Sequence, residues 1–90
     1  PPRSAVLVDD RWVGPGYSLP TIAMVEAVRL AAAREGLLLD PVYTGKAFAG
    51  LIGRAREGAF EPGERVLFLH TGGAPSLHAF APVLRDPALG

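Results

Sequence analysis

Polar side chains that could bind or activate a small molecule gather in three glycine-containing segments of the 90-residue sequence. These segments are GPGYSLP (14–20), DPVYTGK (40–46) and HTGGAP (70–75). Two of them carry a tyrosine, Tyr17 or Tyr43, whose hydroxyl is of a type that can transfer a proton or bind a substrate. Taken individually, each tyrosine is more often an amphipathic packing residue whose hydroxyl is hydrogen-bonded. The pattern therefore yields two candidate acid–base groups, with the packing alternative open.

The segment 70–75 follows the continuous apolar run RVLFL (65–69). In open α/β sheets, ligands bind beyond the carboxyl ends of the strands, and backbone amides at a glycine-rich turn before a helix can hold an anion. Gly72 and Gly73 therefore either take part in ligand binding or simply make a tight turn, and a lone glycine pair does not separate the two. His70 could act as a base, although a hydrogen-bonded, partly buried histidine is the commoner case.

Several hydroxyl and acidic groups have both a functional and a structural interpretation. Thr44 and Thr71 could donate to a ligand, but threonine at the start of a helix is usually a cap. Asp40 is either a ligand-binding residue or a turn and cap residue. Asp9 and Asp10 are either acidic catalysts or the solvated end of a strand, and the pattern favours the solvated end.

Lys46 is the only lysine in the sequence. A lysine that acts as a nucleophile must be desolvated or lie near another cation in order to lose its proton at neutral pH. Lys46 lies early in an expected helix and does not line up with its apolar face, which consists of Phe48, Leu51, Ile52 and Ala55. The spacing favours a structural or solvent-facing role.

The elements that position these groups alternate between strand and helix, which predicts an α/β fold. Apolar runs at 5–10 and 65–69 predict strands, the second buried on both faces of a parallel sheet. A helix is expected at 21–35, with Ser18 as a candidate cap, and a second at about 45–57, followed by glycine stops. A short helix is expected near residue 75, and the tail after residue 80 is expected to be peripheral.

Composition excludes several classes of function. The net charge is zero without a basic stripe, so nucleic-acid binding is not expected. The sequence has no cysteine and no His/carboxylate cluster at metal-ligand spacing, and no apolar run approaches the length of a membrane span. A soluble, cytoplasmic protein is the expectation. Because 49% of the residues are hydrophobic, more than a small autonomous domain needs, we expect surface meant for a partner or for another part of the same polypeptide.

Three stretches together identify a family. EGLLLDPVYTGKAFAGLI (35–52), VLFLHTGGAPSLHAF (66–80) and GPGYSLP resemble the C-terminal part of D-cysteine desulfhydrases and 1-aminocyclopropane-1-carboxylate deaminases. These are pyridoxal-phosphate lyases or deaminases with a tryptophan-synthase-β-like (fold type II) fold. The resemblance implies that residues 1–90 are the C-terminal segment of a larger parallel-sheet, cofactor-binding domain. That segment is expected to be incomplete and inactive alone.

The resemblance also implies roles for individual residues. The lysine that binds pyridoxal phosphate and the main phosphate-binding loop precede this segment in the family, so the rest of the polypeptide or a companion chain would supply them. Lys46 matches a lysine that does not bind the cofactor. Tyr17 and Tyr43 would face a small amino-acid substrate, and the cofactor contacts would come from Thr44, Thr71 and Gly72, with one or both threonines toward the pyridine nitrogen. The complete enzyme would be a homodimer.

Two positions distinguish the branches of the family. The deaminases typically carry glutamate and leucine where this chain has Thr44 and Thr71. A carboxylate at the pyridine nitrogen favours its protonation and a strong electron sink, which opening of a cyclopropane requires, whereas loss of a thiol needs a weaker one. The pair predicts β-elimination from D-cysteine to pyruvate, ammonia and sulfide. The alternatives are 1-aminocyclopropane-1-carboxylate deamination, a lyase of another β-substituted amino acid, or a non-enzymatic binding or assembly module.

Overall fold

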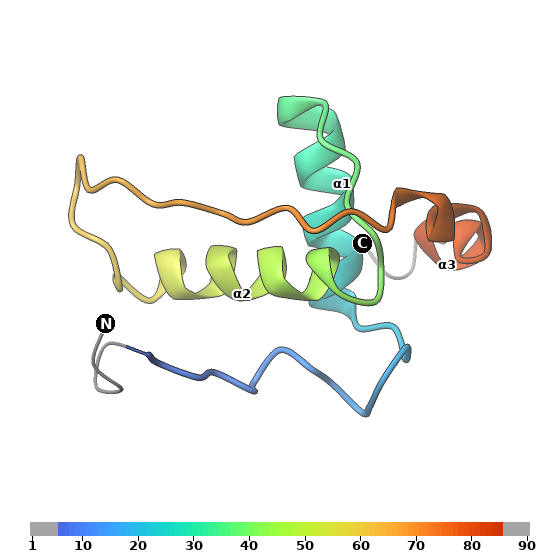
Figure 1. Cartoon of the computed structure of the whole chain (residues 1–90), viewed down its shortest axis with the longest axis horizontal. Coiled ribbons are helices and arrows are strands. Elements are labelled where there is room, and N and C mark those ends of the chain that lie inside the picture. Colours follow the sequence, from blue (N-terminus) through green and yellow to red (C-terminus); the bar gives the residue numbers. More distant parts are fainter. Residues whose placement is uncertain (1–5, 86–90) are drawn as a thin grey trace.

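The structure of the chain, a computed structural model, describes residues 6–85. Its elements are α1 (Ile22–Glu35), α2 (Thr44–Arg56), the 3₁₀ helix η2 (Ala74–His78) and α3 (Ala81–Arg85). Figure 1 shows α2 crossing α1, with η2 and α3 at the far end of the molecule. In that view, the segment that follows α2 returns along one side of this helix and the segment that begins at residue 6 runs along the other.

The first expected helix is confirmed as α1, but a different residue caps it. The hydroxyl of Thr21 accepts a hydrogen bond from the backbone N–H of Met24 at 3.0 Å, so Thr21 rather than Ser18 is the N-cap. Ser18 instead has a left-handed backbone, with φ of 63°. At the other end, Gly36 takes the left-handed conformation that ends a helix and its N–H reaches back into the last turn, as the sequence predicts.

The second expected helix is confirmed as α2, and the side chain of Asp40 organises its start. The Asp40 carboxylate accepts hydrogen bonds from the backbone N–H groups of Val42, Tyr43 and Thr44 at 2.6–2.8 Å and from the Thr44 hydroxyl at 2.6 Å. Burial raises the pKa of Asp40, but the hydrogen bonds, above all that from Thr44, hold its pKa below the usual value. Asp40 is therefore a cap residue.

A small core forms between the helices and the returning segments. Its buried members are Met24, Val25, Val28, Ala31 and Leu39, and its partly buried members are Phe48, Phe68, Leu77, Val83 and Leu84. The last two belong to α3, and Arg29 of α1 donates to the backbone carbonyl of Leu84 at 2.7 Å. The tail after residue 80 was expected to be peripheral, and this is wrong for its described part, because α3 packs on the core. Residues 86–90 of that tail lie outside the described residues.

The expected strands are absent from the part of the chain that the structure describes. Residues 6–10 and 64–69 form no ladder, and Ala5 of the first expected strand lies outside the described residues. The physical reason is that a strand needs a partner: Val8 is 90% exposed and Leu67 is 93% exposed. Among the described residues, none of the helices combines the length and apolar character that crossing a membrane requires.

The isolated chain is expected to self-associate. Its extended segments present unpaired backbone groups and exposed large apolar side chains, which are a template for pairing with other chains. Light scattering at increasing concentration should therefore show species larger than one chain, and heating should give a broad transition. A clean monomer with a cooperative melt would contradict the expectation that these segments need partners.

Candidate active site

Tyr17 and Tyr43 meet through their hydroxyl groups. The two oxygens lie 2.8 Å apart, and the rings contact edge to face with centroids 6.0 Å apart. Tyr17 comes from the loop before α1, and Tyr43 directly precedes α2. The fold therefore brings together two of the three glycine-containing segments that the sequence analysis selected. The hydrogen bond that Tyr43 shares with Tyr17 raises the pKa of Tyr43, because a phenol proton held in that bond is harder to lose.

The pair stands at the surface beside a pocket. Tyr17 is 73% exposed and Tyr43 is 59% exposed, so neither ring is a core residue. The pocket has a volume of about 510 Å³, within the usual range for small-molecule sites. Its lining consists of Asp9, Trp12, Val13, Tyr17, Ser18, Val42, Tyr43, Lys46, Ala47, Gly50, Leu51 and Arg54. An exposed hydroxyl pair at the edge of a mostly apolar hollow can orient a small polar ligand and exchange a proton with it.

Lys46 has the structural one of the two roles that the sequence favours, and it does not face solvent. Its ammonium group is buried and donates to the backbone carbonyls of Val13 at 2.7 Å and Gly16 at 3.0 Å. These bonds hold the Tyr17 loop against the first turns of α2. The amine is thereby occupied by protein groups rather than free to react with a carbonyl compound.

The hydroxyl of Thr44 points inward. It donates to the Asp40 carboxylate at 2.6 Å and accepts from the Asp40 backbone N–H at 2.8 Å, and Thr44 is buried. The hydroxyl thus completes the cap of α2. Of the two roles considered for Thr44, donor to a ligand or helix cap, this contact is that of a helix cap. Thr44 directly follows Tyr43, so the same cap also holds the backbone of the exposed tyrosine.

Thr71 and Gly72 lie in an exposed turn that packs on Asp40. The Gly72 N–H donates to His70 Nδ1 at 3.0 Å, so His70 Nε2 carries the ring proton and donates to the Leu38 carbonyl at 2.8 Å. His70 is hydrogen-bonded, as the sequence favours, although it is exposed rather than partly buried. Gly73 has φ of 91°, and a Cβ there would lie 2.9 Å from Asp40, so only glycine brings the turn this close.

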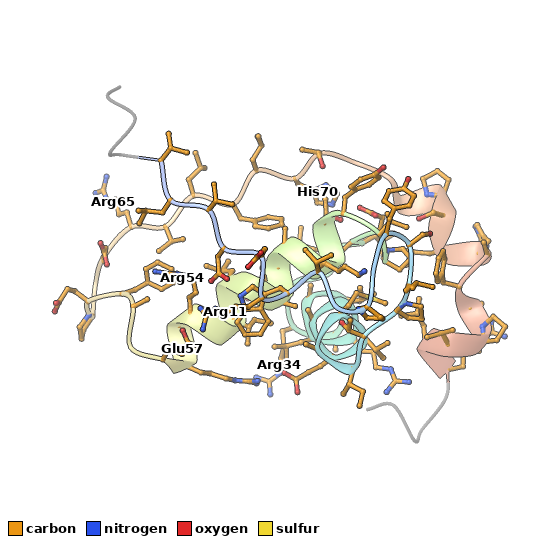
Figure 2. All side chains as sticks on the ribbon, turned by 90° about the horizontal axis from the view of Figure 1, so that it is seen from below. Arg11, Arg34, Arg54, Glu57, Arg65 and His70 are labelled. Carbon is orange, nitrogen blue, oxygen red and sulfur yellow. The ribbon has the colours of Figure 1, made fainter. Side chains whose placement is uncertain are left out.

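An ionic cluster fastens the first described residues to the end of α2. Arg11 contacts Asp9 at 2.7 Å and Glu57 at 2.7 Å, and Arg54 lies 3.4 Å from Asp9. Figure 2 shows Arg11, Arg54 and Glu57 gathered beside α2. The hydrogen bonds from Arg11 lower the pKa of Asp9. The prediction that Asp9 is a solvated strand end is therefore wrong, because its carboxylate is ion-paired. Asp10 is exposed, as that prediction requires.

The structure brings the sequence-selected residues into two neighbouring groups. Tyr17 and Tyr43 form the exposed pair, while Thr44 and the 70–73 turn both contact Asp40 behind it. The sequence did not predict that Asp40 would contact both Thr44 and the 70–73 turn, because a single aspartate before proline is typical of an ordinary turn. Its spacing of four residues from Thr44 at a helix start is the signal that would have found it.

Comparisons with known proteins identify the family of the chain and its relatives. A family model described as pyridoxal-phosphate dependent enzyme matches residues 1–72. The chain is 51% identical over 81 residues to a 1-aminocyclopropane-1-carboxylate deaminase of Burkholderia vietnamiensis and 49% and 48% identical to those of Burkholderia ambifaria and Burkholderia multivorans. Each match covers 90% of this chain and 24% of the relative. The chain thus spans about a quarter of the length of the curated relatives it matches.

The described residues fit one part of a pyridoxal-phosphate site. The exposed hydroxyls of Tyr17 and Tyr43 offer hydrogen-bonding groups beside an open pocket, and Thr71 is exposed in the turn at 70–73. Lys46 does not fit as the amine that binds the cofactor, because two carbonyls hold its ammonium group. The family model covers most of the sequence and the site has room and hydroxyls for such a ligand, so the chain belongs to the family of pyridoxal-phosphate dependent enzymes.

Proposed function

We propose that the chain is the C-terminal segment of a pyridoxal-phosphate-dependent enzyme that releases ammonia from a small amino acid, and that it forms the substrate-facing wall of the active site. The observation that carries the proposal is the exposed Tyr17–Tyr43 hydroxyl pair beside the pocket, in a chain of this family. The rest of the polypeptide, or a companion chain, would supply the cofactor-binding lysine and the phosphate loop. This complete enzyme would be a homodimer.

The chemistry divides between cofactor and protein. When bound, pyridoxal phosphate withdraws electrons from the bonds at the α carbon of an amino acid. In the tyrosine pair, one hydroxyl donates to the other, which leaves one proton free to point toward a ligand. Tyr43 is a phenol and is therefore protonated at neutral pH, and the bond shared with Tyr17 shifts its pKa further upward. Tyr43 can thus act as a general acid at Oη, with Tyr17 as its hydrogen-bond partner.

The first candidate substrate is 1-aminocyclopropane-1-carboxylate, since relatives of about half identity carry the name of its deaminase. An acid at Tyr43 Oη suits this reaction, because opening of the small ring leaves a carbon that must gain a proton. The remaining wall of the pocket is largely apolar and would accommodate a small hydrocarbon ring.

D-Cysteine is the second candidate, favoured by Thr44 and Thr71. Both side chains are neutral hydroxyls where the deaminase branch typically has glutamate and leucine. The Thr44 hydroxyl donates to Asp40, and a carboxylate at that position could not donate this bond. Thr71 is exposed and, with Gly72, remains a proposed cofactor contact.

Product assays of the complete enzyme test the proposal. With pyridoxal phosphate bound, it is expected to release ammonia and 2-oxobutanoate from 1-aminocyclopropane-1-carboxylate. Predominant release of sulfide and pyruvate from D-cysteine would establish the second candidate instead, with L-cysteine as the control for chirality. The absence of any 2-oxo acid from these substrates, in enzyme shown to hold cofactor, would overturn the proposal.

A further inference from the structure

We propose that Lys46, the only lysine of the sequence, is a positioning residue that sets the contact between Tyr17 and Tyr43. Its expected effect on turnover rests on the proposed function, whereas its effect on the tyrosine contact does not. Lys46 would act without touching substrate or cofactor, through the loop that carries Tyr17.

The geometry makes Lys46 a link between the two backbone segments that carry the tyrosines. Its Nζ donates to the carbonyl of Gly16, the residue directly before Tyr17, and to the carbonyl of Val13. Lys46 itself lies three residues after Tyr43, near the start of α2. Two charge-assisted hydrogen bonds therefore join the backbone next to one tyrosine to the helix that the other precedes.

The loop needs such an anchor because its backbone is irregular. Gly14 and Ser18 have φ of 76° and 63°, and a non-glycine residue in this region persists only when its surroundings hold it there. A backbone hydrogen bond across the loop tip, from the Leu19 N–H to the Gly16 carbonyl at 3.2 Å, shares its acceptor with Lys46. An ammonium group suits this place because it offers three donors and no acceptor.

The other tyrosine is fixed independently. The Asp40 carboxylate accepts a hydrogen bond from the Tyr43 N–H at 2.6 Å, so the backbone of Tyr43 is held by the cap of α2. Removal of Lys46 would therefore release Tyr17 while Tyr43 stays in place. The loss of the hydroxyl contact is the specific consequence that separates positioning from a general loss of stability.

Chemical reactivity of Tyr43 tests this inference in the complete enzyme without substrate. Tetranitromethane modifies phenolates, and the hydrogen bond shared with Tyr17 holds the Tyr43 proton and raises its pKa, so an intact pair protects Tyr43. Lys46→Met should raise the nitration rate of Tyr43, measured by peptide mass spectrometry, by about threefold to tenfold. This factor corresponds to the loss of one hydrogen bond. Lys46→Arg should retain most of the protection, since guanidinium also donates twice.

Three controls separate the interpretations. Tyr17→Phe should raise the rate to the same level, and Lys46→Met should add nothing in that background. Val28→Ala, a core change away from the loop, and Arg56→Met, which removes a cation of α2 paired with Glu26, should leave the rate unchanged. If Lys46→Met does not fold, Lys46→Gln takes its place.

An unchanged Tyr43 nitration rate in Lys46→Met or Lys46→Gln would overturn the inference, as would equal increases in Val28→Ala. Loss of kcat in Lys46→Met with recovery in Lys46→Arg would extend it to turnover. If nitration responds and turnover does not, the positioning role stands and the catalytic role proposed for the tyrosine pair fails.

Discussion

Replacing Tyr43 by phenylalanine in the complete enzyme is expected to lower kcat by about 10²–10⁴-fold, the usual contribution of a positioned acid or base. The substitution removes one oxygen from a ring that is 59% exposed, so little packing is lost. Its hydroxyl bonds to another side chain at the surface rather than to the core. Steady-state kinetics together with thermal unfolding would show a large kinetic effect beside a nearly unchanged melting temperature.

Tyr17→Phe is the matched control, because it removes the partner oxygen and leaves that of Tyr43. It should cost less than Tyr43→Phe if Tyr43 carries the transferred proton, and more if the roles are reversed. Turnover within twofold of the parent enzyme in both variants would reduce the pair to surface packing.

Replacing Asp40 by alanine is expected to destabilise the protein by about 3 kcal/mol or more. The carboxylate caps α2 through three backbone N–H groups and the Thr44 hydroxyl, and hydrogen bonds to charged groups contribute about 1.5–3 kcal/mol each. Asp40 is 1% exposed, so water cannot take over these contacts without rearrangement. Denaturant unfolding of the complete enzyme, or of its excised C-terminal segment in a soluble complex, would measure the change.

The same carboxylate predicts a pH dependence. Its pKa in the folded chain lies below the unfolded value of about 3.8, so its contribution is present above that value and is lost as pH falls through the lower folded pKa. Asp40→Asn should therefore flatten the acid limb of the stability curve. Thr44→Val, which removes one of the four bonds to the carboxylate, should cost less than Asp40→Ala. Equal stability of Asp40→Ala and the parent protein would contradict the cap.

The parts of the fold that the sequence predicts are those that local chemistry determines. The expected start of a helix at Thr21, Gly36 at its end and Gly58, whose φ of 80° follows the end of α2, all mark boundaries within one or two residues, although Ser18 was expected as the cap in place of Thr21. The position of Lys46 off the apolar face of α2 left a structural and a solvent-facing role open, and its burial selects the structural one. Such signals act over a few residues and do not depend on the rest of the polypeptide.

The parts that the sequence could not settle depend on distant contacts. Residues 65–69 have the composition of a buried strand, yet Leu67 remains exposed because this chain does not pair it with a neighbour. The contacts between Tyr17 and Tyr43 and between Gly73 and Asp40 join residues more than 25 positions apart, and no local pattern encodes them. The packing of α3 on Met24 and its neighbours is of the same kind.

A crystal structure of the complete enzyme with pyridoxal phosphate and an unreactive substrate analogue is the most direct test of the proposal that the Tyr17–Tyr43 pair faces the substrate. We expect the Tyr43 hydroxyl, the Tyr17 hydroxyl or both to lie within hydrogen-bonding distance of the analogue, about 2.5–3.2 Å. We also expect the Lys46 ammonium group to keep its contacts with the loop rather than with the cofactor. A structure in which both hydroxyls face away from the analogue, or in which Lys46 binds the cofactor, would show that the proposed roles of these residues are wrong.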